Sequence, residues 1–549
     1  MKLLKYSGHS KVIFLLIGAG LALAFCLTLV LAQRIRDASR QVRPRSISPN
    51  SREIVLGAGG NLQEAIKLAK FGDTIILEAG ATYLGPVILP NKGPGSGTDA
   101  DYITIRTANL SEIAKDGERI KPAVHSRFMP KIVSPSQSVA VGTEPQAHHY
   151  RFVGVEFAPS ASANYVFNLI DLGASDYSSY SSFPHHLVFD RCYVHSTGLN
   201  KARRGFALNS GEASIINSHI SGFAGAGDET QAISSWNGPG PFHIINNFLE
   251  AGSELILIGG SDPSIPNLVP SDIEIRRNYF HRPSEWSGKA TIKGTFELKN
   301  ARRVVVDGNL LESEILTTAF VITTRNQNGK APWSVIEDVQ ITNNIVRHAS
   351  SGFNIMGSDN VHPSEEAKRI RIANNLLLDL VPDDPHNSAF FLQLNGVDFL
   401  TIEHNTVQQT GNIIVSFNRP TRNFVFRDNI VQFNLYGFVC GLTGVTCPAE
   451  NPFCNCFPGG IMARNVVADN LNAVANEPKD RICPPGNFLV RSYDQVGFVN
   501  YVMGSWGLAG TSKYRGRATS GKDPGVDFSA IEASGVNKAT DGTALPLPN

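Results

Sequence analysis

The sequence predicts an all-β solenoid, in which the chain winds through successive coils of short strands. The main observation is a phrase of alternating apolar residues that leads into a polar pair ending in Asn. The phrase appears with its Asn at positions 247, 278, 309, 344, 375, 405 and 429. A period of about 30 residues is typical of repeat architectures, and alternation with a period of two residues indicates strands. Gly (50) and Pro (31) supply the many corners that such a chain needs.

Each recurring Asn is expected where two strands meet at a corner. Asn adopts the left-handed backbone conformation more readily than other non-glycine residues, because its short amide bonds the local backbone. Asn side chains stacked from coil to coil also form hydrogen-bonded ladders. In two earlier, less regular coils, Cys192 and Ser218 occupy the position of the Asn. Hairpin turns would not return at this spacing, so the pattern favours a solenoid.

The folded body is expected to begin near Ile54, with a short amphipathic helix over 61–70. The motif Gly-Asp-Thr-Ile-x-Leu and then a Tyr-x-Gly turn follow within residues 71–85. This order of elements resembles the opening of right-handed parallel β-helix proteins of the pectate-lyase-like superfamily. The resemblance as a whole extends over roughly residues 54–510. The resemblance implies a right-handed parallel β-helix of about ten to twelve coils, with the N-terminal helix covering the exposed end of the first coil.

Residues 1–32 are predicted to be an export element, either a cleaved signal peptide or a retained membrane anchor. Three lysines precede an uncharged, mostly apolar run over residues 12–32. The run is long enough to span a bilayer, so attachment to a membrane through it stays open. A basic linker is expected over 33–52, the β-helix over 53–510 and a C-terminal tail over 511–549. The body is therefore expected to be extracellular or in the cell envelope.

The folded body is mildly acidic. Residues 1–52 hold nine Lys and Arg against one acidic residue, which leaves 40 basic and 47 acidic residues for the rest. This balance argues against nucleic acid as the main partner, and no glycine-rich phosphate loop is present. The expected partner is a polysaccharide, and the expected state is a monomer.

Four cysteines gather in an irregular segment over 440–458, namely Cys440, Cys447, Cys454 and Cys456. They predict a disulfide-stapled insertion in the β-helix and an oxidising destination. Zinc is the alternative, although the spacing is irregular and no His lies in the cluster. The pairing of the cysteines stays open at this point.

Two pairs of adjacent histidines fall in polar insertions, at 148–149 and 185–186. They lack metal-ligand spacing, and the sequence predicts no metal site there. The insertions themselves, over 107–149 and 173–186, are expected to build the functional face, because loops on one side of a solenoid usually do so. No cofactor is required by the sequence, although Ca²⁺ is possible.

The candidate site lies mainly between residues 225 and 312, where polar residues interrupt the repeats. If Phe296 and Leu298 point inward, Glu297 and Lys299 point outward from the same strand. Outward residues stacked about 4.8 Å apart from coil to coil suit a linear polymer. The predicted catalytic residues are Lys293, Lys299, Glu297, His281 and Asp228. The predicted substrate-binding residues are Glu254, Arg282, Trp286, Trp236, Asn354 and Gln393.

Each candidate also has a purely structural explanation. Glu297 and Lys299 are spaced as a solvated ion pair on one strand. Asp228 and Gln231 can cap a turn, and His281 and Trp286 can pack a loop against the body. These explanations stay open beside the functional ones.

Two reactions use such residues differently. A polysaccharide lyase needs a base to take the proton beside a uronate carboxylate, and a cation to stabilise the resulting charge. The basic groups would come from Lys293, Lys299, His281 and Arg282, with Asp228, Glu254 and Glu297 as possible Ca²⁺ ligands. A glycoside hydrolase would instead use two of these three acids. The signature motifs of pectate lyases, polygalacturonases and pectin methylesterases are absent. The sequence favours a lyase, with a hydrolase and a non-catalytic glycan-binding protein as alternatives.

Overall fold

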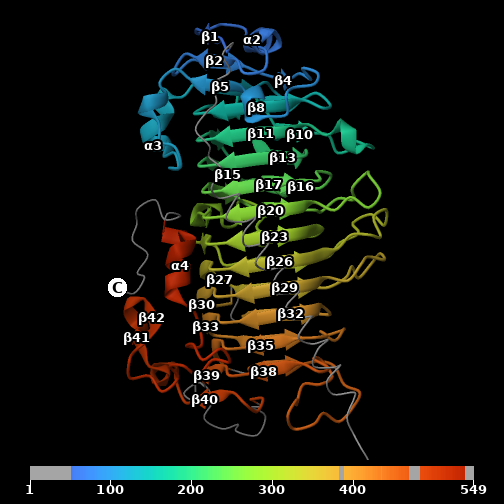
Figure 1. Ribbon diagram of the computed structural model, residues 1–549, viewed down its shortest axis with the longest axis vertical. Coiled ribbons are helices and arrows are strands. Elements are labelled where there is room, and N and C mark those ends of the chain that lie inside the picture. The colour runs from blue at the N-terminus through green and yellow to red at the C-terminus, as the bar shows by residue number, and fades with distance from the viewer. Residues whose placement is uncertain (1–50, 383–388, 435, 469–482, 538–549) are drawn as a thin grey trace, which may run out of the picture.

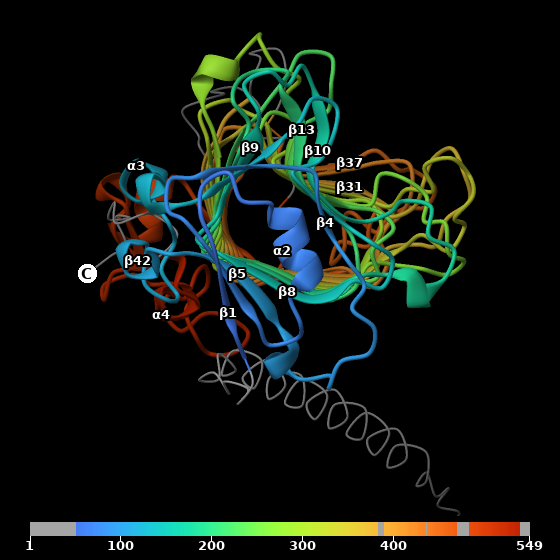
Figure 2. The same cartoon turned by 90° about the horizontal axis from the view of Figure 1, so that it is seen from above.

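The chain forms a parallel β-helix with three faces (Figures 1 and 2). The computed structural model describes residues 51–382, 389–434, 436–468 and 483–537. Within them, three long sheets contain only parallel neighbours, and the twelve strands of the shortest sheet mark twelve complete coils. The predicted right-handed parallel β-helix is confirmed, and it is the architecture of the superfamily that the N-terminal motif resembles. The predicted export element and nearly all of the predicted linker lie outside the described residues.

The first sheet, sheet A, receives the strand that opens each coil. Its strands are β1 Glu53–Leu56, β2 Thr74–Leu77, β5 Ile103–Thr107, β8 His148–Val153, β11 His185–Asp190, β14 Ala213–Ile216, β17 Phe242–Ile245, β20 Ser271–Arg276, β23 Ala301–Asp307, β26 Ile336–Thr342, β29 Lys368–Ala373, β32 Asp398–Glu403, β35 Val425–Arg427 and β38 Ile461–Ala463.

Sheet B follows it after a corner. Its strands are β3 Thr82–Leu84, β6 Lys131–Ser134, β9 Glu156–Pro159, β12 Tyr193–His195, β15 His219–Phe223, β18 Phe248–Ala251, β21 Tyr279–Arg282, β24 Leu310–Ser313, β27 Ile345–Ala349, β30 Leu376–Leu380, β33 Thr406–Gln409, β36 Ile430–Gln432, β39 Val466–Ala468 and β40 Phe488–Val490.

Sheet C closes each coil. Its strands are β4 Val87–Leu89, β7 Val141–Thr143, β10 Val166–Gly173, β13 Ala202–Asn209, β16 Gln231–Ser235, β19 Glu254–Ile258, β22 Phe296–Leu298, β25 Thr318–Thr323, β28 Ser351–Met356, β31 Phe390–Asn395, β34 Asn412–Ser416 and β37 Phe438–Cys440. A short antiparallel pair, β41 Phe498–Asn500 and β42 Ser505–Leu508, follows the last coil.

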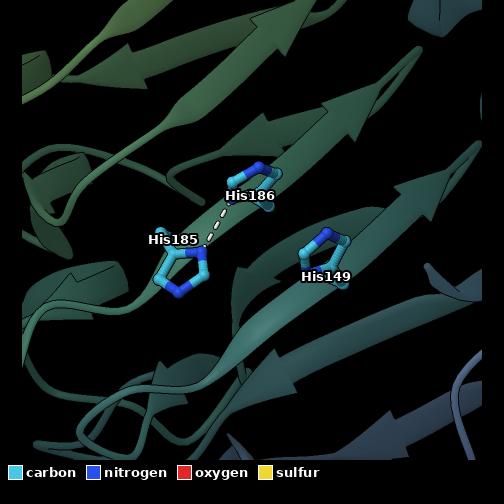
Figure 3. Close-up of side chains that lie close together, drawn as sticks. All are labelled: His149, His185 and His186. Carbon is cyan, nitrogen blue, oxygen red and sulfur yellow. Dashed lines mark hydrogen bonds between the residues drawn. The ribbon is translucent and has the colours of Figure 1, made fainter. Parts of the chain in front are cut away.

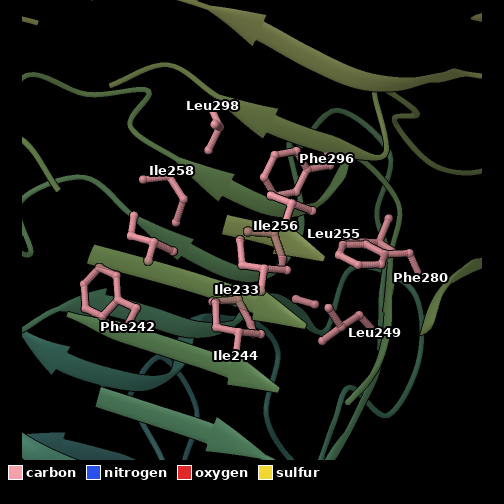
Figure 4. Packing of buried hydrophobic residues seen from close by; sticks show 14 of the residues in the cluster. Ile233, Phe242, Ile244, Leu249, Leu255, Ile256, Ile258, Phe280, Phe296 and Leu298 are labelled. Atoms are coloured by element: carbon pink, nitrogen blue, oxygen red, sulfur yellow. The ribbon is translucent and has the colours of Figure 1, made fainter. Parts of the chain in front are cut away.

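The core runs along the inside of all three sheets. In a typical stretch, Phe242 of sheet A, Phe280 of sheet B and Phe296 of sheet C point toward one another, and each is fully buried (Figure 4). Because side chains alternate across a strand, the residues between them point away from the core. The outward side chains of each sheet therefore form columns that run along the β-helix.

The predicted Asn ladder is present at the corner between sheets A and B. Asn344, for example, accepts hydrogen bonds at its side-chain oxygen from the backbone N–H and the Nδ2 of Asn309, both at 2.9 Å. Its own Nδ2 donates to Val306 O and to Asn375 Oδ1, each at 3.0 Å. The same pattern continues through buried Asn residues to Asn487. Each rung thus satisfies backbone groups of its neighbouring coils as well as the next Asn.

One detail of the ladder was predicted wrongly. The left-handed residue of each corner is the one before the ladder Asn, as at Asn246, Asn343 and His404, and not the Asn itself. The left-handed turn lets the following side chain point into the corner, where it bonds to the neighbouring coils. Ser218 occupies the ladder position as predicted: its N–H donates to Asn247 Oδ1 at 2.9 Å, and its hydroxyl accepts from Cys192 N at 2.9 Å.

A helix lies at the N-terminal end, where the sequence predicts one. Helix α2 spans Leu62–Leu68, and the side chain of Asn61 accepts a hydrogen bond from Glu64 N at 3.1 Å, which caps its first turn. Its apolar face, including Leu62 and Ile66, is buried against the core. In the view down the axis, α2 lies inside the outline of the coils (Figure 2).

The outer face of sheet B is covered by two segments far apart in sequence. The insertion after β5 contains α3, Pro122–His125, and the tail contains α4, Phe528–Ser534, and both lie on the same side of the β-helix (Figures 1 and 2). Ile531 and Val536 of the tail are buried against outward residues of sheet B such as Leu310. The range 107–149, predicted as a polar insertion, thus contains part of this cover of sheet B as well as strands β6 and β7. No helix in the described part of the chain is long and apolar enough to cross a membrane.

The cysteine-rich insertion is stapled by two disulfides, as predicted. Cys440 pairs with Cys456, and Cys447 pairs with Cys454 inside that loop. Paired cysteines are not available as thiolate ligands, so the zinc alternative is excluded for this segment. Phe453 and Cys456 are buried against the last coils of the core, so the insertion covers this part of the β-helix.

We expect the two disulfides to contribute unequally to stability. The Cys440–Cys456 bond closes the longer loop, with a sequence separation of 16 against 7, and it joins β37 to a buried residue. Chain-entropy arguments give about 3 kcal/mol for a loop of that length and less for the inner one. The double variant Cys440→Ser/Cys456→Ser should therefore lower the thermal midpoint more than Cys447→Ser/Cys454→Ser. Equal shifts in scanning calorimetry would contradict this ranking.

Candidate active site

A column of buried polar side chains follows the outer face of sheet C. Asn168, Arg204, Gln231 and Glu254 stand in register on β10, β13, β16 and β19. Arg204 Nε donates to Gln231 Oε1 at 2.7 Å, and Gln231 Nε2 donates to Glu254 Oε2 at 2.8 Å. Glu254 is 0% exposed, and its Oε1 has no hydrogen-bond partner. Two of these buried groups, Arg204 and Glu254, are ionisable and costly to bury, which favours a functional role for the column.

A second outward column runs beside the first. Its members in coil order are Asp171, Ala207, Ser234, Leu257, Glu297, Val321, Asn354 and Gln393. Glu297 lies between Phe296 and Leu298, whose side chains point into the core (Figure 4). The predicted orientation of β22 is thus confirmed. Asn354 and Gln393 are neighbours in this column, and the two side chains approach to 3.5 Å.

Two carboxylates and two lysines meet where the columns come together. The Glu254 carboxyl lies close enough to Glu297 to help raise the pKa of Glu297. Lys299 Nζ lies 3.5 Å from Glu297 Oε2, and Lys293 Nζ lies 3.9 Å from Glu254 Oε1. Lys293 also forms a close ion pair with Glu229, from the loop before β16. Lys293 and Glu229 are half-exposed, whereas Glu297 is 8% exposed, so solvent reaches the cluster from the Lys293 side.

The pKa of Glu297 is the most informative electrostatic feature of this cluster. Burial raises it to about 7, the neighbouring Glu254 carboxyl adds to the rise, and Lys299 and Lys293 oppose it. Although burial acts against it, the hydrogen bond to Glu229 and the charges of Glu254 and Glu297 hold the pKa of Lys293 above its ordinary value. At neutral pH, Glu297 is therefore poised between its two protonation states beside a charged lysine.

Aromatic rings flank Arg204 at the edge of the cluster. Its guanidinium lies 4.9 Å from the ring centre of Phe167 and 5.1 Å from that of Trp236. Burial lowers the pKa of Arg204 to about 10, which still leaves it charged at neutral pH. Phe167 is exposed. A fixed cation beside an exposed ring is suited to an anionic, partly apolar ligand such as a uronate.

The other predicted residues lie elsewhere. Asp228 accepts a hydrogen bond from Tyr165 OH at 2.8 Å, beside the cluster but turned toward that ring. His281 is on sheet B, between Glu250 at 3.2 Å and Glu314 at 3.6 Å. Arg282 is 1% exposed and donates to Ser253 O at 2.6 Å, so it holds the corner between sheets B and C. Trp286 is buried. The structure thus brings Lys293, Lys299, Glu297 and Glu254 together, and it does not bring His281 to them.

A polar hollow continues the site along sheet C. Gln393 lines it, together with Thr318, Ser351, Asn412 and Tyr436. Gln393 is three coils from Glu297 in the same column, which corresponds to about 14 Å at the usual strand spacing. The distance suits a polymer that lies along the column and extends beyond the charged cluster.

The suggested calcium ligands do not converge. Within the part of the chain that the structure describes, one group of three His, Cys, Asp or Glu side chains has its ligand atoms within 4.8 Å of one another, and it consists of histidines on sheet A. Asp228, Glu254 and Glu297 are not such a group, and Lys293 and Lys299 already supply positive charge beside the carboxylates. These three acids are thus poorly arranged to share one Ca²⁺, which needs six to eight oxygen ligands.

Sequence reasoning missed Arg204, Glu229 and Asn168, and it took Gln231 for a turn residue. The signal was available in part, because Arg204 and Gln231 are polar residues in otherwise apolar strands. Their alignment with each other could not be predicted, because successive coils differ in length on the sheet C side. The register Arg204–Gln231–Glu254 has spacings of 27 and 23 residues.

The comparisons with known proteins give distant similarities. No protein-family model matches the chain, and no curated protein sequence matches it. An alginate lyase from Paenibacillus sp. str. FPU-7 is 15% identical over 60% of this chain and 97% of its own, with a TM-score of 0.34. The pectate lyase Pel9A is 12% identical over 87% and 96%, with a TM-score of 0.40. A GH87 alpha-1,3-glucanase from Streptomyces thermodiastaticus strain HF3-3 is 11% identical over 81% and 70%, with a TM-score of 0.44. At these TM-scores the similarities carry no conclusion, and the fold rests on the strand pairing of the chain itself.

Proposed function

We propose that this protein is a polysaccharide lyase that binds an acidic polysaccharide along sheet C and cleaves it by β-elimination at a uronate. The observation that carries the proposal is the cluster in which Lys293 lies 3.9 Å from Glu254 and Lys299 lies 3.5 Å from Glu297. It combines a carboxyl group that titrates near neutral pH with fixed positive charge. Those are the two things that proton abstraction beside a carboxylate requires.

The residues take distinct roles in this reaction. Ionised Glu297 accepts the proton from the carbon next to the uronate carboxylate, and the released electron pair forms the carbon–carbon double bond as the glycosidic carbon–oxygen bond breaks. Lys299 returns a proton to the leaving oxygen. Lys293 and Arg204 neutralise the uronate carboxylate, whose charge grows as the proton leaves. Glu254 is fully buried and acts as a positioning residue for Lys293 and Gln231.

Hydrolysis by this pair of acids is disfavoured by the burial of Glu254. A glycoside hydrolase needs two carboxyl groups that flank the scissile bond. Glu254 is 0% exposed, so it does not reach a bond of a substrate that lies on the outside of sheet C. Binding without turnover is the other alternative, and it is supported by the exposed ring of Phe167 beside Arg204.

The direct test is an assay on polymers of different charge. The full chain is incubated with polygalacturonate, alginate and a neutral glucan, each with Ca²⁺ or with a chelator. The lyase proposal predicts ultraviolet absorbance from unsaturated uronates, rising together with new reducing ends, on an acidic polymer alone. Reducing ends without absorbance would replace it by hydrolysis. Binding of acidic polymers with neither signal would leave a glycan-binding protein.

We also propose that the body acts as an exported monomer, with α2 as the cap of its first coil. Two disulfides support export, because such bonds persist in oxidising compartments. Protease added to intact cells should digest the body if it is exposed outside them, whereas a cytoplasmic marker should survive. Size-exclusion chromatography with light scattering tests the monomer.

A further inference from the structure

Four histidines form a compact array on sheet A, remote from the charged cluster of sheet C. The two pairs open β8 and β11, which are adjacent parallel strands with His148 opposite His185. The prediction that the pairs lie in separate polar insertions is wrong, because sequence spacing does not reveal which strands become neighbours. Figure 3 shows the rings of His149, His185 and His186 on these two strands.

The backbone brings both rings of each pair to the same side. Adjacent residues of a regular strand point to opposite faces, but His149 and His186 have left-handed φ angles of 58° and 53°. As a result, the Nδ1 atoms of His148 and His149 are 2.6 Å apart, and those of His185 and His186 are 2.7 Å apart. The pairs also stack on each other, with 4.9 Å between the rings of His148 and His185 and 4.4 Å between those of His149 and His186.

The hydrogen bonds determine which ring nitrogens carry lone pairs. His148 Nε2 lies 2.9 Å from the Gly93 carbonyl and must be the donor there. His148 Nδ1 is then an acceptor, so His149 donates from Nδ1 and keeps a lone pair on Nε2. That Nε2 is buried without a hydrogen-bond partner, on a residue that is 3% exposed. Ring packing alone does not explain an unpaired buried nitrogen, which costs free energy.

We propose that His149, His185 and His186 bind a divalent transition-metal ion of the Zn²⁺ class. Their ligand atoms lie within 4.8 Å of one another. A tetrahedral site with bonds of about 2.0–2.1 Å needs nitrogens about 3.4 Å apart, with the ion in the plane of each ring. The stacked rings of His149 and His186 must therefore turn toward a common point on binding, and the half-buried His185 and His186 are the ones that can move. Imidazole ligands suit zinc, copper and nickel rather than calcium or magnesium. Glu212, 3.3 Å from His186 Nε2, orients that ring from outside.

A bound ion would join β8 to β11 and so fasten two N-terminal coils together, as a structural site does.

The test is metal binding by the full chain, purified in detergent without a histidine tag and stripped with a chelator. The matched variants are His149→Asn and His186→Asn, because Asn tolerates the left-handed backbone. His348→Asn is the control, an exposed histidine with a left-handed φ of 52° on β27 of sheet B. Titration calorimetry with Zn²⁺ should give one equivalent for the native chain and the control, and at least tenfold weaker binding for both variants.

Two further readouts make the result decisive. Co²⁺ should give the visible absorption of a tetrahedral site in the native chain and not in the variants. Zn²⁺ should raise the thermal midpoint of the native chain and of His348→Asn, and it should leave the midpoints of His149→Asn and His186→Asn unchanged. If His149→Asn does not fold, the half-buried His186→Asn decides. Absence of saturable Zn²⁺ binding, or undiminished binding by a folded variant, would overturn the proposal.

Discussion

Replacing Glu297 with glutamine is expected to abolish β-elimination and, at the same time, to stabilise the folded protein at pH 8. The activity is lost because glutamine cannot accept the proton, and removal of a general base typically costs about a hundredfold to ten-thousandfold in rate. The measurement is kcat/KM from the absorbance of unsaturated uronates. Native activity should rise with pH through about 7, as Glu297 loses its proton.

The stability gain follows from the direction of the pKa shift. The pKa of Glu297 is about 7 in the folded protein, against an ordinary value of 4.5. Between these two values the unfolded chain has released the proton while the folded protein still holds it, so folding becomes less favourable as the pH rises from 4.5 to 7. The penalty is complete above 7, at about 1 to 3 kcal/mol. Glutamine does not titrate, so the Glu297→Gln variant does not lose this folding free energy.

Glu297→Gln should therefore gain stability relative to the native chain in urea unfolding at pH 8, and gain little at pH 4.5. The matched control is Glu285→Gln, an exposed carboxylate in the loop after β21. It should change neither activity nor stability. Retained activity in Glu297→Gln would refute the role proposed for this residue. So would a stability difference between variant and native chain that favours the variant less at pH 8 than at pH 4.5.

Replacing Asn344 with leucine is expected to cause a large loss of stability. The change removes four hydrogen bonds, two accepted from Asn309 and two donated to Val306 O and Asn375 Oδ1. All of these groups are buried, and each group left without a partner costs about 1 to 3 kcal/mol. Several such losses together are comparable to the whole free energy of unfolding of a typical domain. We expect at least about 4 kcal/mol in urea unfolding.

A graded series separates hydrogen bonding from packing. Asn344→Ser should be less harmful than Asn344→Leu, because Ser218 natively serves as a rung of the ladder with its hydroxyl. The control Asn328→Ala changes an exposed residue in a turn and should have little effect. Equal free energies of unfolding for Asn344→Leu and Asn344→Ser would contradict the stabilising role of the ladder hydrogen bonds.

The charged cluster was predicted only in part. Lys293, Glu297 and Lys299 are close in sequence, and the period of two in β22 was enough to predict that Glu297 and Lys299 share a face. Glu254 was nearby in the sequence and was assigned to substrate binding, but its complete burial and its position 3.9 Å from Lys293 required the coordinates. Arg204 and Glu229 come from earlier coils and were not predicted. His281 was assigned wrongly to their neighbourhood, since it follows the corner onto sheet B.

The repeats of the sequence determined the fold by themselves. A solenoid buries one phrase against the next identical phrase, so its core and its Asn ladder depend on local alternation and a regular period, and both can be read along the chain. The functional sites depend on which residues of different coils become neighbours. That choice is made by insertions of unequal length, such as those before β11 and β22, and no local pattern encodes it. The charged cluster on sheet C and the histidine array on sheet A were therefore decided only by the tertiary structure.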